Sequence, residues 1–274
     1  MDLPLPFGAT DATHHRPGSI VAVTRALPEE TAIAMVYDGT THAVMMATPA
    51  DIEDFAMGFS LTEGIVTGPH QIATCDVIAH PKGIEAQMWL AEDRGTQLAA
   101  RRRTLAGPVG CGLCGIDSIE AAVRSLPGLS GVGPMLTAGD IASATESLRV
   151  WQPLHDRTRA VHAAGFMLPG QGVVLSREDV GRHNALDKLI GAMARQGIDP
   201  AQGAIVLTSR VSTEMVQKCV IAGCAVLIAV SAPTLHALRL AEGAGLTLAA
   251  FARAEGFDLF CHPERLRERV SDVA

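Results

Sequence analysis

AIVLTSRVSTEMVQKCVIAGCAVLIAVSAPTLHALRLAEGAGLTLAAF, residues 204–251, is the stretch that decides the fold. Three short apolar runs in it are typical of buried strands, at residues 204–209, 225–230 and 246–251. Two stretches between them have the apolar spacing of amphipathic helices, at residues 213–222 and 234–242. Because right-handed crossovers place helices on both faces, this alternation predicts a largely parallel sheet between two helical layers.

The residues just before this stretch extend the pattern. A hairpin is predicted from strands at residues 161–167 and 173–176 with a turn at 169–172, and a helix is predicted at residues 184–195. We therefore expect residues 134–274 to form a three-layer α/β domain. The glycine- and proline-rich run at residues 127–134 is the best linker in the chain.

The first half has a different rhythm, which predicts an α+β domain at residues 19–133 with mostly antiparallel strands. Strands are expected at residues 20–26, 32–37, 41–47, 72–79 and 83–90, with an Asp38-Gly39 hairpin turn, a further segment at 97–104 and a helix at 117–126. Thr48, Pro49 and Asp51 are typical of a helix start. Residues 1–18 contain three prolines and no apolar run, so we expect a flexible N-terminal tail.

Composition restricts the class of protein. The chain has 274 residues, 48% of them hydrophobic, and a formal net charge of −7, which disfavours nucleic acid as a partner. Residues 219–238 lack charged side chains, but Gly223 and Pro233 interrupt them, so a buried segment is favoured over a membrane span. The N-terminus lacks the features of a signal peptide, which predicts a cytoplasmic protein with six reduced cysteines.

Cys111-Gly-Leu-Cys114 is the sharpest chemical feature of the sequence. Glycines at positions 107, 110, 112 and 115 keep bulky side chains away from both thiols. An accessible thiolate attacks a sulfur donor and holds a persulfide, and a second thiol three residues away helps to transfer or discharge it. The pattern therefore indicates sulfur-relay chemistry.

Other chemistries fit the cysteine pair less well. A structural zinc site needs four ligands, and no second C-x-x-C or matching histidine pair is present, so we expect no metal site. A thioredoxin-like pair or a G-x-G-x-x-G dinucleotide fingerprint requires a βαβ context, whereas this pair follows an antiparallel half. The only H-x-E, at His262 to Glu264, comes after the pair, which disfavours a zinc deaminase. Of the four further cysteines, Cys219 and Cys224 are expected to be small buried hydrophobes and Cys75 to lie within a strand. Cys261 with His262 could ligate a metal, but packing is favoured for a single Cys-His pair without further ligands.

Polar residues follow several strands of the second half. The segment at residues 176–184, the turn at 208–213 and the turn at 231–234 should gather at the carboxyl edge of the sheet, which favours a ligand that bears a phosphate or a nucleotide. His183, Asn184 and Arg210 are candidate contacts there, although helix capping explains His183 or Asn184 taken singly. At residues 251–256, an aromatic, an arginine and a glycine suit base stacking and pyrophosphate contact, and an ordinary exposed strand end fits equally well.

Five segments taken together resemble the FdhD family (FdhD/NarQ-like), accessory proteins of molybdenum- or tungsten-dependent formate dehydrogenases. They are GCGLCG at 110–115, REDVGRHNALDK at 177–188, SRVSTEMVQK at 209–218, SAPT at 231–234 and FAR at 251–253. The resemblance implies a cytidine-deaminase-like second domain without the deaminase zinc site, and a cytoplasmic homodimer. It also implies two partners, a cysteine desulfurase and the catalytic subunit of formate dehydrogenase.

The resemblance carries specific roles to this chain. Cys111 matches the family's persulfide cysteine and Cys114 its companion. The guanine-dinucleotide segment falls on Phe251, Ala252, Arg253, Ala254, Glu255 and Gly256. The implied activity is that of a sulfurtransferase acting on the bis(molybdopterin guanine dinucleotide) cofactor, which GDP mimics. The alternative is a non-catalytic chaperone that binds and inserts this cofactor without relaying sulfur.

Overall fold

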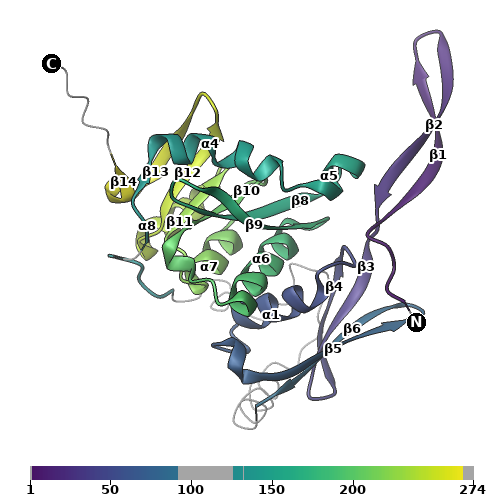
Figure 1. Ribbon diagram of the computed structural model, residues 1–274, viewed down its shortest axis with the longest axis horizontal. Coiled ribbons are helices and arrows are strands. Elements are labelled where there is room, and N and C mark those ends of the chain that lie inside the picture. Colours follow the sequence, from purple (N-terminus) through teal and green to yellow (C-terminus); the bar gives the residue numbers. More distant parts are fainter. Residues whose placement is uncertain (1, 92–125, 132, 268–274) are drawn as a thin grey trace.

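The computed structural model describes residues 2–91, 126–131 and 133–267. Figure 1 shows a larger layered body, a smaller sheet below that body with one helix between the two, and a two-stranded ribbon that projects to one side. The predicted segment at residues 97–104 lies outside the described residues, as does all but the last residue of the helix predicted at 117–126.

The smaller sheet has the strand order β4-β3-β6-β5. Its strands are β3 (Thr31–Tyr37), β4 (Thr40–Ala47), β5 (Ile72–His80) and β6 (Gly83–Leu90), and only the pairing of β3 with β6 is parallel. Helix α1 (Ile52–Thr62) packs against this sheet. Large apolar side chains alternate along the strands and point towards the helix, so they form a separate core that includes Ile33, Tyr37, Phe55 and Met88.

The N-terminal tail prediction is wrong for most of its length. Strand β1 (Phe7–Arg16) pairs antiparallel with β2 (Ser19–Pro28) over ten residue pairs, and the ribbon they form stands away from the body (Figure 1). Pro17 and Gly18 make the turn, and Gly18 has a φ of +82°, as a proline-glycine turn requires. The Pro-Gly pair was the sequence signal for this hairpin.

The predicted cap of α1 is also wrong. The helix begins at Ile52, after Asp51 in a left-handed conformation (φ 54°), and no side chain caps it. Thr48 is fully buried instead: its N–H donates to Asp179 Oδ2 at 3.0 Å, and its Oγ1 accepts from the N–H of Val180 at 3.1 Å. The hydroxyl of Thr48 therefore bonds to the second half of the chain and is not available to cap α1.

The larger sheet has the order β13-β12-β11-β10-β8-β9, with parallel pairing only among β10, β11 and β12. The prediction of a largely parallel sheet is therefore wrong, because β8, β9 and β13 join it in antiparallel pairs. Its strands are β8 (His162–Leu168), β9 (Gly172–Asp179), β10 (Ala204–Leu207), β11 (Val226–Ala229), β12 (Thr247–Arg253) and β13 (Gly256–Cys261). The strands and helices predicted within residues 204–251 are confirmed to within three residues at each end, as is the hairpin before them.

Helices cover both faces of this sheet. One face carries α6 (Arg182–Gln196), α7 (Thr213–Ile221) and α8 (Leu235–Ala244), and the other carries α4 (Ala138–Arg149), which is followed by the short α5 (Pro153–Thr158). A pair of short parallel strands, β7 (Leu136–Thr137) and β14 (Leu266–Arg267), lies beside the body, and 3₁₀ turns occupy residues 69–71, 200–202 and 263–265. Each face of the sheet has its own apolar cluster.

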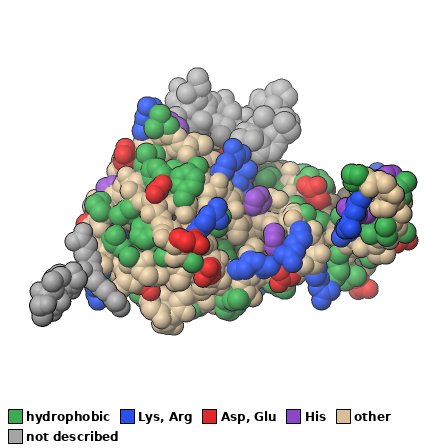
Figure 2. Space-filling view, turned by 90° about the horizontal axis from the view of Figure 1, so that it is seen from above, with side chains coloured by type: hydrophobic (Ala, Val, Ile, Leu, Met, Phe, Trp, Pro, Cys, Tyr) green, Lys and Arg blue, Asp and Glu red, His purple; other side chains and the backbone are tan. Residues whose placement is uncertain are grey.

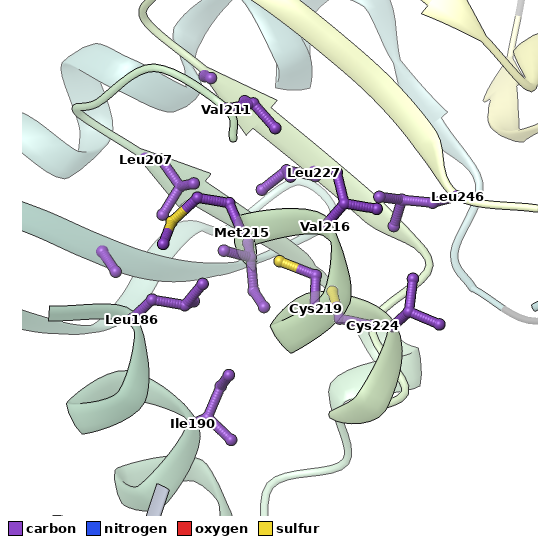
Figure 3. Packing of buried hydrophobic residues seen from close by; sticks show 14 of the residues in the cluster. Leu186, Ile190, Leu207, Val211, Met215, Val216, Cys219, Cys224, Leu227 and Leu246 are labelled. Carbon is purple, nitrogen blue, oxygen red and sulfur yellow. The ribbon is translucent and has the colours of Figure 1, made fainter. Parts of the chain in front are cut away.

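Figure 3 shows the cluster on the α6–α7 face, where Leu186 and Ile190 of α6 face Met215 and Cys219 of α7. Cys219 and Cys224 are fully buried in it, and Cys261 is 9% exposed at its border. The expectation that these three cysteines are small core residues is confirmed.

The two halves meet where α1 crosses α6, and a glycine on each helix permits the crossing. A Cβ atom added to Gly58 would lie 1.7 Å from the backbone oxygen of Asp187. One added to Gly191 would lie 1.8 Å from the backbone oxygen of Asp54. The two helices are therefore in backbone contact, and no other residue type fits at either position.

Buried charges surround this crossing. Lys188 is completely buried, and its Nζ lies 2.6 Å from Asp179 Oδ2 and donates to the backbone oxygen of Thr48 at 2.9 Å. The preceding residue, Asp187, accepts from Lys218 at 2.8 Å and from Thr62 Oγ1 at 2.8 Å. These charges link α1 and the strand before it to β9, α6 and α7, so the halves are docked in one defined arrangement.

Replacing Gly58 or Gly191 with alanine should lower the free energy of unfolding by about 1–3 kcal/mol or more, because the new methyl group overlaps the facing backbone. Gly243→Ala is the control: this helical glycine has no atom within 4 Å of an added Cβ, so the change should be stabilising by up to about 1 kcal/mol. Urea denaturation measures all three. Similar small effects at the three positions would contradict the crossing.

Lys188→Met should cost about 3–5 kcal/mol of stability, because it leaves the Asp179 carboxylate buried without its cation. The exposed Lys82→Met change serves as the control and should stay within about 0.5 kcal/mol of the unaltered protein. Thermal and urea unfolding report both values. If Lys188→Met unfolded like Lys82→Met, the buried pair would not hold the halves together.

Candidate functional site

A cleft of about 750 Å³ opens at the carboxyl edge of the larger sheet. Thr208, Val230 and Arg253, at the ends of β10, β11 and β12, line it, and the end of α4 with α5 forms a wall of it. The sequence predicted that polar strand ends would gather at this edge. The structure brings the ends of three strands together in this one hollow.

The cleft is mixed in charge but rich in cations. Its titratable side chains are Glu146, Arg149, His155, Arg159, His162, Arg253 and Glu255. In the face drawn in Figure 2, blue arginine and lysine side chains and purple histidines gather across the middle of the view and towards the projecting ribbon. Three guanidinium groups in one hollow favour an anionic ligand, although the protein as a whole carries a net charge of −7.

Helix α5 is held in place by Glu178, the second residue of the REDVGRHNALDK segment. The Glu178 carboxylate accepts from the backbone N–H groups of Leu154 and His155, both at 2.8 Å, at the start of the helix. Burial raises the pKa of Glu178, and these two hydrogen bonds oppose that shift. The helix ends at Arg159, which adopts a left-handed conformation with a φ of 57°. The start of α5 is therefore fixed by two hydrogen bonds to Glu178, and its end by the left-handed backbone of Arg159.

His162 lies where β8 begins, beside the Asp179 end of β9. Burial lowers the pKa of His162, and the positive charge of Arg182 lowers it further. The imidazole is therefore neutral at neutral pH. It offers one ring N–H and one ring acceptor to a ligand in the cleft.

Residues Phe251 to Gly256 form the end of β12 and the turn into β13. Arg253, Ala254 and Glu255 line the cleft, whereas Ala252 is buried and its backbone oxygen accepts from Thr145 Oγ1 at 3.1 Å. Phe251 is 44% exposed, has a φ of 52° and lies 6.4 Å from the ring of Phe260. A bulky residue with positive φ is rare and marks a locally strained strand end.

The structure places the other three candidate residues outside the cleft. His183 Nε2 lies 2.5 Å from Glu214 Oε2, and Arg210 is exposed on the turn after β10. Asn184 is buried, and its Nδ2 donates to the backbone oxygen of Met46 at 2.8 Å and to Asp179 Oδ1 at 3.1 Å. The Asn184 amide is therefore used in docking the two halves.

Cys111 and Cys114 lie outside the described residues. The four other cysteines are described, and burial raises the pKa of Cys75, Cys224 and Cys261 to about 11 and that of Cys219 well above its ordinary value. These four thiols stay protonated at neutral pH, and a protonated thiol is a poor nucleophile.

Sequence reasoning missed the α4–α5 wall. Arg149, His155, Arg159 and His162 come from one stretch of fourteen residues, counted from 149 to 162, that also contains Arg157. This density of arginine and histidine was the available signal. Nothing local shows that the stretch faces the strand ends, because the contact depends on how α4 packs across the sheet.

Two further observations describe the chain broadly. Among the described residues, no helix is long and apolar enough to cross a bilayer. In the same residues, no group of three or more histidine, cysteine, aspartate or glutamate side chains is arranged to hold a metal ion.

Known proteins give a consistent comparison. The family model of the FdhD/NarQ family matches residues 28–267. A protein of Agrobacterium fabrum named sulfur carrier protein FdhD is 51% identical over 251 residues, which are 92% of this chain and 93% of the relative. A protein of Brucella abortus with the same name is 55% identical over 254 residues, 93% of this chain and 94% of the relative.

A solved structure supports the fold. It belongs to a candidate formate dehydrogenase accessory protein of Desulfotalea psychrophila, with a TM-score of 0.73 and 24% identity, and the match covers 96% of this chain and all of that one. At this identity the likeness shows the mixed α/β fold alone. The family match and the two relatives, which span nearly the whole chain, show that this protein belongs to the FdhD/NarQ family.

Proposed function

We propose that this protein is a sulfur carrier in the maturation of formate dehydrogenase. In this proposal it takes persulfide sulfur from a cysteine desulfurase onto Cys111 and passes it to the bis(molybdopterin guanine dinucleotide) cofactor of molybdenum or tungsten. The observation that carries the proposal is the Cys111-Gly-Leu-Cys114 pair in a chain that matches relatives named sulfur carrier proteins over nearly its whole length. Since burial keeps the four described thiols protonated, the pair supplies the remaining candidates for a reactive thiolate.

The loading step is a thiol–persulfide exchange. The Cys111 thiolate attacks the terminal sulfur of the donor's persulfide, so a sulfur–sulfur bond forms at Cys111 while the donor's own bond breaks and leaves a thiolate. Discharge by Cys114 would release hydrosulfide and leave a Cys111–Cys114 disulfide, which a thiol reductant then reopens. This second step gives the companion cysteine its role.

The cleft is the proposed seat of the guanine dinucleotide. Its arginines suit phosphate oxygens, since guanidinium groups bind phosphates through paired N–H donors. The carboxylates of Glu146 and Glu255 suit the N–H groups of a guanine base. The exposed ring of Phe251 offers an apolar surface close to the same strand end.

The wider architecture is part of the same proposal. We propose that residues 134–274 form a cytidine-deaminase-like domain and that residues 19–133 form a separate α+β domain. The six-stranded sheet with helices on both faces supports the first, and the separate core beneath α1 supports the second. A cytoplasmic homodimer that serves the catalytic subunit of formate dehydrogenase completes the proposal.

The rival function is a chaperone that binds the cofactor and inserts it without relaying sulfur. The observation that favours this alternative is that no described cysteine lines the cleft, so a ligand can bind there without a thiol. The two functions differ in what happens when Cys111 is removed, because a chaperone needs no reactive thiol.

After incubation with a cysteine desulfurase and cysteine, the intact mass of the protein should rise by one sulfur atom, and peptide mapping should place that atom on Cys111. Cys111→Ala should lose the added sulfur. Cys75→Ala should keep it, because burial raises the pKa of Cys75 to about 11 and leaves that thiol unreactive. Sulfur mapped to Cys75, or retained by Cys111→Ala, would exclude Cys111 as the carrier.

In cells that lack their own copy of this protein, Cys111→Ala should fail to restore formate dehydrogenase activity, although the variant accumulates at a normal level. The Cys219→Ala control keeps Cys111 and should restore most activity, despite some loss of stability from a truncated core residue. Full activity with Cys111→Ala would instead establish the chaperone.

A further inference from the structure

Two arginines on the α4–α5 wall share one carboxylate. Arg149, the last residue of α4, forms a hydrogen-bonded ion pair with Asp156 Oδ1 on α5. Arg159 Nη1, just after α5, lies 3.6 Å from the same oxygen. Arg149 and Arg159 both line the cleft, so Asp156 holds two cationic side chains of the cleft together.

This arrangement is exposed, which makes it exchangeable. The side chains of Arg149, Asp156 and Arg159 are 43%, 52% and 65% exposed. An ion pair between side chains as open as these contributes little to stability, so a competing anion can replace its carboxylate at low cost. The buried pairs at the helix crossing, such as Lys188 with Asp179, are fully enclosed and offer no such exchange.

The backbone beneath the arginines is fixed, unlike their side chains. Glu178 accepts from the N–H groups of Leu154 and His155 at the start of α5, and Arg159 is held in a left-handed conformation at its end. Positive φ at a non-glycine residue costs energy and recurs at binding sites. A wall with a fixed backbone and two exposed guanidinium groups is suited to a ligand with several acceptor oxygens.

The cleft has a further cation that is available to join them. The side chain of Arg253, at the end of β12, has no ion-pair or hydrogen-bond partner among the described residues. A diphosphate carries more charge and more acceptor oxygens than one carboxylate. It can therefore accept from Arg149 and Arg159 together where Asp156 offers a single oxygen to both.

We propose that Arg149 and Arg159 form the diphosphate subsite of the cleft and that Asp156 occupies this subsite as an internal anion until the ligand displaces it. This inference rests on the proposed function, in which the ligand is a guanine dinucleotide. It assigns the diphosphate to Arg149 and Arg159 on the α4–α5 wall, with Arg253 available beside them, and leaves the other residues of the Phe251–Gly256 turn to the rest of the nucleotide. The hydrogen bond from Arg149 holds the pKa of Asp156 below its usual range, so the carboxylate competes throughout the neutral pH range.

The test measures binding of GDP and of guanosine to the full chain by isothermal titration calorimetry at low salt. The variants are Arg149→Gln, Arg159→Gln and Asp156→Asn. Arg157→Gln is the matched control. Arg157 lies on α5 next to Asp156, but its guanidinium stacks over the ring of Phe7 in the ribbon, 4.9 Å from the ring centroid. Circular dichroism checks that each variant is folded.

Each arginine variant should weaken GDP binding by about tenfold, since a hydrogen bond to a charged group contributes roughly that factor, and should leave guanosine binding unchanged. Asp156→Asn should tighten GDP binding several-fold, and higher salt should reduce that gain. Arg157→Gln should bind like the unaltered protein.

Two results would overturn the inference while the sulfur-carrier function stands. One is GDP binding that both arginine variants retain in full, and the other is weaker GDP binding by Asp156→Asn. If the unaltered protein bound neither GDP nor guanosine, the cofactor-binding part of the proposed function would fail together with this inference. Sulfur loading of Cys111, measured separately by mass, distinguishes these cases because loading does not need the cleft.

Discussion

The close crossing of α1 and α6 is the contact on which the rest of the structure depends. Gly58 and Gly191 let the two backbones touch, and the buried Lys188–Asp179 and Lys218–Asp187 pairs then lie beside the crossing. Buried charges tolerate little displacement, because each must keep its partner in a medium that solvates it poorly. Helix contact and charge pairing together allow one arrangement of the two halves.

Two of the segments that resemble the family supply the side chains at this crossing. The REDVGRHNALDK segment supplies Asp179, Asn184, Asp187 and Lys188, and all four side chains act in docking the halves. The SRVSTEMVQK segment supplies Lys218, which pairs with Asp187. From the first segment, Glu178 supports the cleft through the start of α5, and Val180 lines it. These two segments, which resemble the family, therefore mainly hold the two halves together.

The crossing of α1 and α6 also fixes the two anchor points of the segment that carries the cysteine pair. The described residues on either side of the segment that carries the pair are anchored on different halves. Ala91 donates its N–H to the backbone oxygen of Gln71 at 3.0 Å beside the smaller sheet. Leu129 donates to the oxygen of Ala244 at 2.8 Å and accepts from Arg265 at 2.7 Å on the larger body. The described residues that flank this segment are thus anchored on two halves that are locked together, one of which carries the cleft.

The sequence by itself determined the family, the cysteine pair as the chemical feature, and the strands and helices of residues 204–251, because short apolar runs and helical spacing are local signals. Only the tertiary structure decided that Thr48 and Asn184 join the two halves, and that Arg149 and Arg159 face the ends of β10, β11 and β12. Residues 7–16 became a strand only through pairing with β2, although the proline-glycine turn was visible. The physical reason is that a local pattern sets which face of an element is apolar, whereas the partner it meets depends on helix crossings and buried charges between residues more than a hundred positions apart.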